Sequence, residues 1–296
     1  MFGAYWYGGK RAWRTGPALV TMLRTMRAHG VLRYIPQWAL DNGRAHVKKD
    51  DVRAICAGEG IEVVLGLGCD PADPKRAPEL HGQRVATAII TALEELPGVP
   101  LSIDWEGWWS GKRGIAAMVA DRVLTAVPDA HERIEDCPWW APLYVERKDG
   151  TRQWTQPSAP TREFGELFSK RPRYVQAYGA QADGSPYGRS LAMLAWSRSP
   201  SQYASLGAWR IMPTTQLYAR TVADHATTLT REPEQNLWAW NEADPRALTA
   251  LRAVDALRAR GDTGPSANTA LQRAASRVPD GLLGPRRRRA LAGRAR

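Results

Sequence analysis

The sequence has little of what disulfide frameworks and metal centres require. Its 296 residues hold three cysteines, Cys56, Cys69 and Cys137, and five histidines. Because the cysteines are odd in number and widely spaced, they argue against a disulfide framework and favour a reducing compartment. No C-x-x-C or H-E-x-x-H pair occurs, so we expect no metal site, and no motif calls for a cofactor.

Nucleotide-binding and hydrolase loops are missing as well. The segment 66–70, Gly-Leu-Gly-Cys-Asp, lacks the third glycine of a dinucleotide fingerprint, and there is no Walker loop and no G-x-S-x-G elbow. No apolar run is long enough to span a bilayer. Residues 1–10 lack a basic region followed by an apolar one, so we expect synthesis in the cytoplasm without a signal peptide.

Strand-like and helix-like segments alternate eight times in a chain of ordinary composition, 44% apolar and 24% charged. The expected strands are 3–7, 32–38, 61–67, 100–106, 141–145, 174–178, 208–212 and 236–240. The expected helices are 17–28, 49–58, 79–96, 114–127, 161–168, 188–197, 214–229 and 244–260. Short apolar strands that alternate with helices indicate βα units and a parallel sheet.

Eight such units predict the α/β class and a (β/α)8 TIM barrel, whose typical size is about 250 residues. A doubly wound open sheet is the competing fold, but the regular units and the missing glycine-rich first turn disfavour it. The fifth unit is the least regular. Residues 137–156 are aromatic and polar, as in a hairpin or a long loop.

Residues 99–109 end an apolar strand in two carboxylates, Asp104 and Glu106. In a strand, residues i and i+2 point to the same face at a rise of roughly 6.6–6.8 Å. Two neighbouring carboxylates cannot both ionise freely, so one can keep its proton and act as an acid. Sugar-bond hydrolysis needs such a pair. A strand end with two solvated acids is the plain alternative.

Other candidate residues fall at the carboxyl ends of the predicted strands, where the active site of such a barrel lies. The expected substrate-binding residues are Tyr5, Tyr7, Gln37, Trp38, Asp70, Trp108, Gln176, Trp238 and Trp240. Of these, Trp108 follows the acid pair. Tyr178 ends the sixth strand and joins the acids as a catalytic candidate. Aromatic residues around a carboxylate pair are typical of a glycan cleft. For the tyrosine and the tryptophans, barrel packing is the alternative.

The run Asp104-Trp105-Glu106 resembles the end of the D-x-x-D-x-D-x-E motif of glycoside hydrolase family 18. This family contains chitinases and endo-β-N-acetylglucosaminidases. The run also resembles the D-x-E of family 25 lysozymes. The resemblance implies that Glu106 protonates the leaving oxygen, and that Asp104 orients an N-acetyl group or stabilises oxocarbenium charge. Tyr178 would donate to the N-acetyl carbonyl. We expect Asp104 in the solvated mouth of the barrel rather than in a packed core.

Two departures separate the chain from these families. The upstream acids of the family 18 motif would fall at Val99 and Ser102, and neither residue is acidic. The first-strand aspartate of family 25 is absent from residues 3–7. The sequence therefore predicts a lysozyme- or chitinase-like barrel without placing it in either family.

The C-terminal residues carry most of the excess charge. From Pro265 to Arg296, eight arginines against Asp280 leave +7 of the net +11. Residues 261–266 have the composition of a linker. Residues 268–291 resemble a small three-helix peptidoglycan-binding domain in Leu271-Gln272, Asp280-Gly281 and Gly284-Pro285. Arg287 stands where that family usually has threonine, and the closing helix is short or absent.

We therefore expect two parts: a glycosidase-like barrel over 1–260, and a linker with a short, basic, helical, peptidoglycan-binding-like tail over 261–296. A basic tail without a binding module is the alternative. A cell-wall glycosidase of lysozyme or N-acetylglucosaminidase type is the leading hypothesis. It would act on peptidoglycan or another N-acetylated glycan, as a phage endolysin or in a phage-like particle.

The tail would contact anionic wall polymers, whereas nucleic acid is not expected as a partner of the only mildly basic barrel. A non-catalytic carbohydrate-binding barrel of a phage particle and an enzyme of unrelated chemistry are the other hypotheses.

Overall fold

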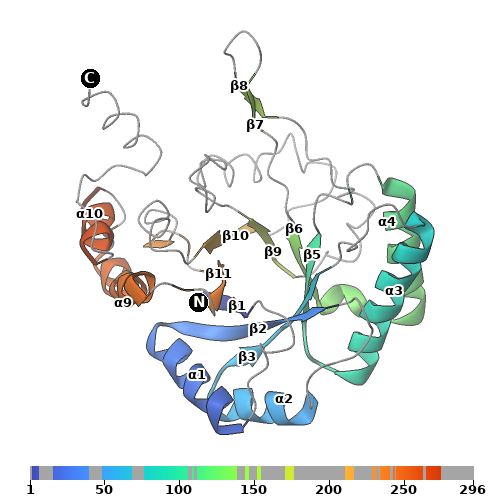
Figure 1. Cartoon of the computed structure of the whole chain (residues 1–296), viewed down its shortest axis with the longest axis horizontal. Coiled ribbons are helices and arrows are strands. Elements are labelled where there is room, and N and C mark those ends of the chain that lie inside the picture. Colours follow the sequence, from blue (N-terminus) through green and yellow to red (C-terminus); the bar gives the residue numbers. More distant parts are fainter. Residues whose placement is uncertain are drawn as a thin grey trace.

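A parallel β-sheet with helices on its outer side forms the body of the protein (Figure 1). The computed structural model describes residues 2–6, 16–39, 49–68, 77–105, 109, 112–138, 144–146, 152–154, 171–176, 211–216, 229–230, 232, 234–240, 243, 245–262 and 265–274. The strands of this sheet are β1 (Phe2–Trp6), β2 (Val31–Ala39), β3 (Glu62–Val63), β4 (Leu65–Gly68), β5 (Leu101–Trp105), β6 (Ile134–Pro138), β9 (Arg173–Gln176), β10 (Ile211–Gln216) and β11 (Gln235–Trp238).

The sheet closes on itself through β1. This strand pairs in parallel with β11 on one side and with β2 on the other. The ring runs β1, β2, β4, β5, β6, β9, β10, β11 and back to β1, and each of these pairings is parallel. The short β3 lies beside β2, just before β4. Because parallel strands run in one direction, their carboxyl ends all lie at one rim of the ring.

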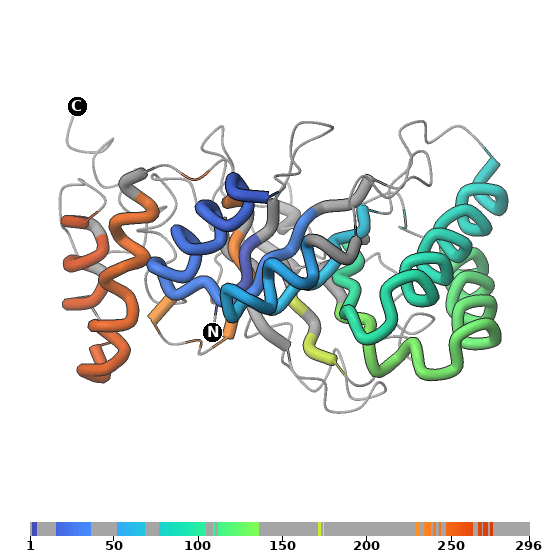
Figure 2. The backbone as a smooth tube through the Cα atoms, turned by 90° about the horizontal axis from the view of Figure 1, so that it is seen from below, coloured from blue at the N-terminus to red at the C-terminus, as the bar shows by residue number. Residues whose placement is uncertain are grey.

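Helices cover the outside of the ring, as the alternation of apolar segments predicts. They are α1 (Gly16–Ala28), α2 (Lys49–Gly58), α3 (Pro78–Glu95), α4 (Arg113–Ala126), α9 (Pro245–Ala259) and α10 (Pro265–Ala274). Figure 2 shows α3 beside α4 at one end of the molecule and α9 beside α10 at the other. The predicted α/β class with a parallel sheet is confirmed. The helices expected at 161–168 and 188–197 lie outside the described residues.

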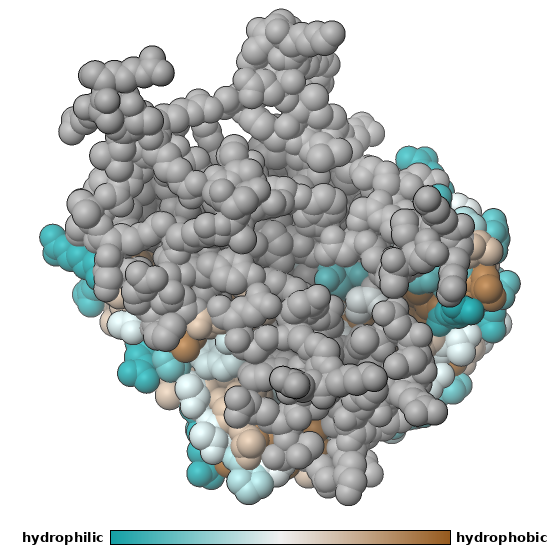
Figure 3. Space-filling view, viewed as in Figure 1, coloured by the Kyte–Doolittle hydropathy of each residue, from teal (hydrophilic) through white to brown (hydrophobic). Residues whose placement is uncertain are grey.

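Two apolar clusters join the sheet to its helices. One contains Phe2 and Ala4 of β1 with residues of α1, α9 and α10, and the other contains Leu101 and Ile103 of β5 with residues of α3 and α4. Successive strand residues point to opposite faces. The residues between these apolar ones, such as Ser102 in β5, therefore face the inside of the ring. Figure 3 shows polar residues interspersed with apolar ones over the outer helices.

The predicted fifth strand at 141–145 is wrong. The ring strand of this unit is β6, which ends before residue 141. β6 pairs with β5 along its whole length. Tyr144–Glu146 instead forms β7, which pairs in antiparallel fashion with β8 (Arg152–Trp154) in a separate sheet. Glu135 and Asp136 make this segment look polar in the sequence, although the buried carboxylate of Glu135 finds its partner Arg33 on the distant strand β2.

Two other predicted boundaries also differ from the structure. The strand expected at 61–67 is divided into β3 and β4 at Val64, whose N–H still donates to the carbonyl of Tyr34 in β2 at 2.9 Å. The helix expected to begin at 214 starts too early, because β10 continues through Pro213 to Gln216. Most of the remaining helix prediction lies outside the described residues.

Helix α10, which follows the predicted linker, packs onto the helices that cover the ring. Ala267 and Leu271 of α10 are fully buried in the apolar cluster that contains Phe2 of β1 and Leu251 of α9. The domain boundary at 261 stays a prediction, but α10 shares its core with the preceding part. A truncation that removes the basic residues without disturbing this packing should begin after Ala274.

Replacing Leu271 with alanine tests this packing. Truncating a fully buried leucine should lower the free energy of unfolding by about 2–5 kcal/mol. The control, Arg273→Ala on the exposed side of the same helix, should change it by less than about 0.5 kcal/mol. Urea denaturation of the full chain measures both, and equal small effects would show that α10 is a separate appendage.

Candidate functional site

Asp104 lies at the carboxyl end of β5, on the inner face of the ring. It is the last but one residue of the strand, and it alternates with Leu101 and Ile103, which face the helices. Its register partners are Gly68 at the end of β4 and Cys137 in β6. The side chain is 9% exposed, so the expectation of a solvated position is wrong. Asp104 is a largely buried carboxylate at the rim where parallel strands end.

Glu106 follows β5 directly, and its position relative to Asp104 stays a prediction. Residue 105 is the last of the strand, and residues 106–108 lie outside the described part of the chain. If the strand's alternation continued by one step, Glu106 would share the inner face with Asp104.

The other predicted site residues divide into two groups. The backbones of Tyr5, Gln37, Trp38, Gln176 and Trp238 belong to ring strands, near their carboxyl ends. The closed pairing therefore brings these backbone positions to the same rim as Asp104, for example Gln37 beside Gly66 of β4. Their side chains lie outside the described part. Tyr7, Asp70, Trp108 and Tyr178 fall wholly outside it, so all these roles stay predictions.

Trp240 is placed in the apolar core rather than at the inner rim. Its side chain is 8% exposed and belongs to the cluster beneath α1 and α9. The indole meets the ring of His29 edge-on, with centroids 5.6 Å apart and planes at 73°. The imidazole bonds the carbonyl of Thr25 through Nδ1 at 2.7 Å, and Nε2 accepts the Nε–H of Arg252 at 3.2 Å. This environment is that of a packing residue rather than of a substrate contact.

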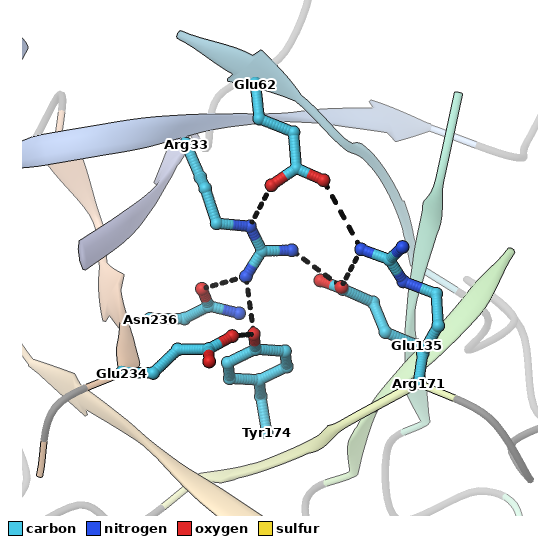
Figure 4. Close-up of polar contacts among 7 residues, drawn as sticks. All are labelled: Arg33, Glu62, Glu135, Arg171, Tyr174, Glu234 and Asn236. Carbon is cyan, nitrogen blue, oxygen red and sulfur yellow. Dashed lines mark hydrogen bonds and ion pairs between the residues drawn. The ribbon is translucent and has the colours of Figure 1, made fainter. Parts of the chain in front are cut away.

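A second polar group, missed by the sequence analysis, lies at the opposite end of the ring (Figure 4). Its centre is Arg33, the third residue of β2. The residues around Arg33 come from β3, β6, β9, β11 and the segments just before β9 and β11, and they are Glu62, Glu135, Arg171, Tyr174, Glu234 and Asn236. Each lies at or before the amino end of its strand. We call these seven residues the amino-end cluster.

Arg33 uses all three nitrogens of its guanidinium. Nη2 donates to Glu135 Oε2 at 2.6 Å, and Nε donates to Glu62 Oε2 at 2.8 Å. Nη1 donates to the hydroxyl of Tyr174 at 2.7 Å and to Asn236 Oδ1 at 3.2 Å. The guanidinium therefore ties β2 to β3, β6, β9 and β11 at once.

Two further contacts extend the amino-end cluster. Arg171 Nη2 reaches Glu62 Oε1 and Glu135 Oε2, both at 3.3 Å. The Tyr174 hydroxyl donates to Glu234 Oε1 at 2.5 Å. Each of the two arginines thus contacts both Glu62 and Glu135. Such pairing offsets the loss of hydration that buried ionic groups suffer.

Burial shifts the ionisation of this group. The side chains of Arg33 and Glu135 are 2% and 0% exposed. Burial raises the pKa of Glu135, against the opposing effect of Arg33 and Arg171. Burial acts to lower the pKa of Arg33, but Glu135, Tyr174 and Glu62 outweigh it, so the guanidinium stays charged. Burial also raises the pKa of Tyr174, which stays a neutral donor.

The amino-end cluster fills the interior of the ring at the amino ends of the strands and leaves no space beside Gly3. A Cβ built on Gly3 of β1 would lie 2.2 Å from Asn236 Oδ1 and 3.3 Å from Arg33 Cβ, so the cluster fills the space that a larger residue would need. In (β/α)8 barrels the amino ends of the parallel strands serve stability and the carboxyl ends serve chemistry. The geometry therefore assigns the cluster to folding and leaves the Asp104 rim as the candidate site.

Metal and membrane candidates are absent from the described parts of the chain. No three histidine, cysteine, aspartate or glutamate residues within them are grouped so that they could hold a metal ion. No helix among those described combines the length and hydropathy needed to cross a membrane.

Solved structures show where this fold occurs. A chitinase from Chromobacterium violaceum ATCC 12472 matches with a TM-score of 0.55 and 12% identity, over 86% of this chain and 98% of that one. An endocellulase from Pyrococcus horikoshii, in complex with cellotetraose, matches with a TM-score of 0.50 and 11% identity, over 92% of each chain. At these identities the likeness concerns the fold alone.

The spore cortex-lytic enzyme SleL of Bacillus megaterium QM B1551 gives a TM-score of 0.48 at 12% identity, and this chain spans half of its length. No family model matches the sequence, and a search of curated proteins gives no match. The chain thus shares its fold with a chitinase and an endocellulase, two glycoside hydrolases.

Replacing Arg33 with methionine tests whether the amino-end cluster stabilises the fold. The change removes the main partner of a buried carboxylate, and we expect the free energy of unfolding at neutral pH to fall by about 3–5 kcal/mol. Burial already raises the pKa of Glu135, and losing the guanidinium raises it further. A group whose folded pKa is raised stabilises the fold when protonated, so the loss should shrink as the pH falls towards about 5.

Two controls accompany this measurement by urea denaturation. The double variant Arg33→Met/Glu135→Leu should be less destabilised than Arg33→Met alone, because no unpaired charge is left inside. Arg24→Met breaks an ion pair of a largely exposed arginine with Glu59 and should cost little. If Arg33→Met costs no more than Arg24→Met, the cluster does not hold the ring together.

Proposed function

We propose that the protein is a glycoside hydrolase of cell-wall glycans, built on a (β/α)8 barrel. Its substrate would be peptidoglycan or another N-acetylated glycan, cleaved at the carboxyl rim of the ring. The observation that carries the proposal is the position of Asp104, a largely buried carboxylate on the inner face of the ring, one residue before the end of β5. The fold shared with a chitinase and an endocellulase supports the reaction class.

The two carboxylates, Glu106 and Asp104, would have different roles in the reaction. Glu106, just beyond the strand, would protonate the oxygen of the leaving sugar as the general acid. Asp104, held inside the ring, would orient the N-acetyl group or stabilise the oxocarbenium charge that develops at the sugar. Tyr178, two residues beyond the end of β9, would donate a hydrogen bond to the N-acetyl carbonyl.

Aromatic and amide side chains around the same rim would hold the sugar units. Those predicted from the sequence that end or follow ring strands are Tyr5, Tyr7, Gln37, Trp38, Asp70, Trp108, Gln176 and Trp238. Indole and phenol rings suit the apolar faces of sugars, and side-chain amides and carboxylates suit their hydroxyls. The proposed reaction needs no cofactor.

The basic C-terminal residues would serve attachment. Seven of the eight arginines in 265–296 follow α10, and clustered positive charge attracts anionic wall polymers. The protein would act at the bacterial wall, as an endolysin or as part of a phage-like particle. These assignments rest on the sequence and on the proposed substrate.

A non-catalytic carbohydrate-binding barrel is a second candidate, favoured by Val99 and Ser102. At these two positions the family 18 motif carries acids, whereas here Val99 is 3% and Ser102 1% exposed. Val99 packs in the apolar cluster of α3 and α4, and Ser102 on the inner face carries no charge, so fewer groups there can tune the reacting pair. Such a protein would use the same rim to hold a glycan without cleaving it.

One experiment separates the candidates. Purified cell walls are incubated with the full-length protein, and the soluble products are analysed by mass spectrometry alongside turbidity. New reducing ends would establish glycoside hydrolysis, whereas new free amines would point to amidase or peptidase chemistry and contradict the proposal. Co-sedimentation with walls without any soluble product would establish the binding alternative.

The variant Glu106→Gln tests the general acid. Glutamine keeps the shape of the side chain but has no proton to give, so kcat on cell walls should fall by about 10²-fold or more. Co-sedimentation with walls should stay at the wild-type level. The control is Glu79→Gln on the exposed start of α3, which should change neither quantity. Activity of Glu106→Gln within threefold of wild type would remove Glu106 from the mechanism.

Asp104→Asn tests the second carboxylate. The amide is nearly isosteric, so the thermal midpoint should move little while kcat falls by about 10²-fold or more. Ser102→Ala is the matched control, because Ser102 lies two residues earlier in β5 on the same inner face. This control should retain wild-type kcat. If Asp104→Asn lowers the midpoint and leaves the activity per folded molecule unchanged, Asp104 is a structural residue.

A further inference from the structure

Trp109 is a fully buried side chain between the end of a strand and the start of a helix. β5 ends at Trp105 and α4 begins at Arg113. Trp109 is 0% exposed and is the largest of the fully buried side chains in the described part of the chain. Connections between elements usually lie on the surface and carry function on a rigid scaffold. A buried indole in this connection therefore anchors it.

Two helices hold the anchor. The indole belongs to the apolar cluster of α3 and α4, which also contains Ile89. Its ring faces the imidazole of His81 in α3, with centroids 6.2 Å apart and planes inclined at 47°. Its carbonyl accepts the N–H of Lys112, the residue before α4, at 3.0 Å. Trp109 is thus tied to α3 by its side chain and to Lys112, directly before α4, by its backbone.

The other end of the same connection is fixed in the sheet. Trp105 is in register with Pro138, and Asp104 with Cys137, both in β6. The three residues 106–108 therefore join two fixed points, and each residue adds at most about 3.3–3.6 Å of reach.

We propose that Trp109 is the positioning residue for Glu106. This inference rests on the proposed function, in which Glu106 protonates the leaving oxygen. A general acid has to lie within roughly 2.6–3.2 Å of the atom it protonates, and a misplacement of about 1 Å can cost about 10²-fold in rate. By anchoring the connection three residues after Glu106, Trp109 limits where that carboxyl can lie. It touches no substrate and acts through Glu106.

Plain core packing is the competing account of Trp109. Under that account, replacing the indole lowers stability and changes nothing else, as at any other member of the same cluster. Ile89 of α3 supplies the comparison, because it is fully buried in this cluster and belongs to a helix rather than to the connection.

The test compares Trp109→Leu, Trp109→Phe and Ile89→Ala in the full-length protein. We expect Trp109→Leu to lower kcat on cell walls by about 10- to 10²-fold with KM within about twofold. Trp109→Phe, which keeps an aromatic ring against His81, should restore most of the rate. Ile89→Ala should lower the thermal midpoint but leave kcat per folded molecule unchanged. If Trp109→Leu behaves like Ile89→Ala, the inference is overturned.

A second readout does not depend on turnover. Hydrogen exchange in a peptide covering residues 104–112 should be faster in Trp109→Leu than in Ile89→Ala, measured under conditions of equal global stability. Equal exchange would overturn the anchoring role. Unimpaired activity of Glu106→Gln would instead remove Glu106 from the mechanism, and the positioning role with it, even if exchange showed that Trp109 anchors the connection.

Discussion

The structure depends on the parallel pairing of β1 with both β11 and β2. This pairing joins the first strand of the chain to the last strand of the ring, more than 200 residues apart. Closure leaves the ring strands without a free edge, which removes the hazard that open sheet edges carry. Because each pairing around the ring is parallel, all ring strands run in one direction, and the ring has two unlike rims.

The two rims hold different chemistry. At the amino ends, Arg33 and Glu135 form a buried ion pair within a cluster that joins strands from both halves of the chain. Buried ion pairs add little net stability compared with apolar packing, but breaking one leaves a charge that the interior cannot solvate. Removing either partner of this pair would therefore cost more than the intact pair contributes. At the carboxyl ends, Asp104 faces the same interior from β5.

Much of the fold follows from local pattern, and the parts that do not follow are those governed by distant contacts. Strands such as β1 and β5, and helices such as α1 and α3, agree with the apolar periodicity within a few residues. The failure at β6 has a clear cause. Glu135 makes the segment look polar, yet in the fold it meets Arg33, which lies 102 residues earlier in the chain. Nothing in the local sequence can show that partner.

Within the candidate site, the strand position of Asp104 was predictable to the same degree. The D-x-E run at the end of an apolar strand was sufficient to place Asp104 at the carboxyl rim, because strand alternation and parallel topology are local and regular. Its burial was not predictable, since that depends on how closely neighbouring strands enclose it. For Trp240 the sequence left substrate contact and core packing open, because its partner His29, just after α1, lies far away in the chain.

In the proposed function, the carboxyl rim around Asp104 receives a glycan. A crystal structure of the Glu106→Gln variant soaked with an oligomer of N-acetylglucosamine tests it most directly. We expect sugar density at that rim, with a hydroxyl or amide group within hydrogen-bond distance of the Asp104 carboxylate. Sugar bound at the amino-end cluster, or on the outer helices with the rim left empty, would contradict the account.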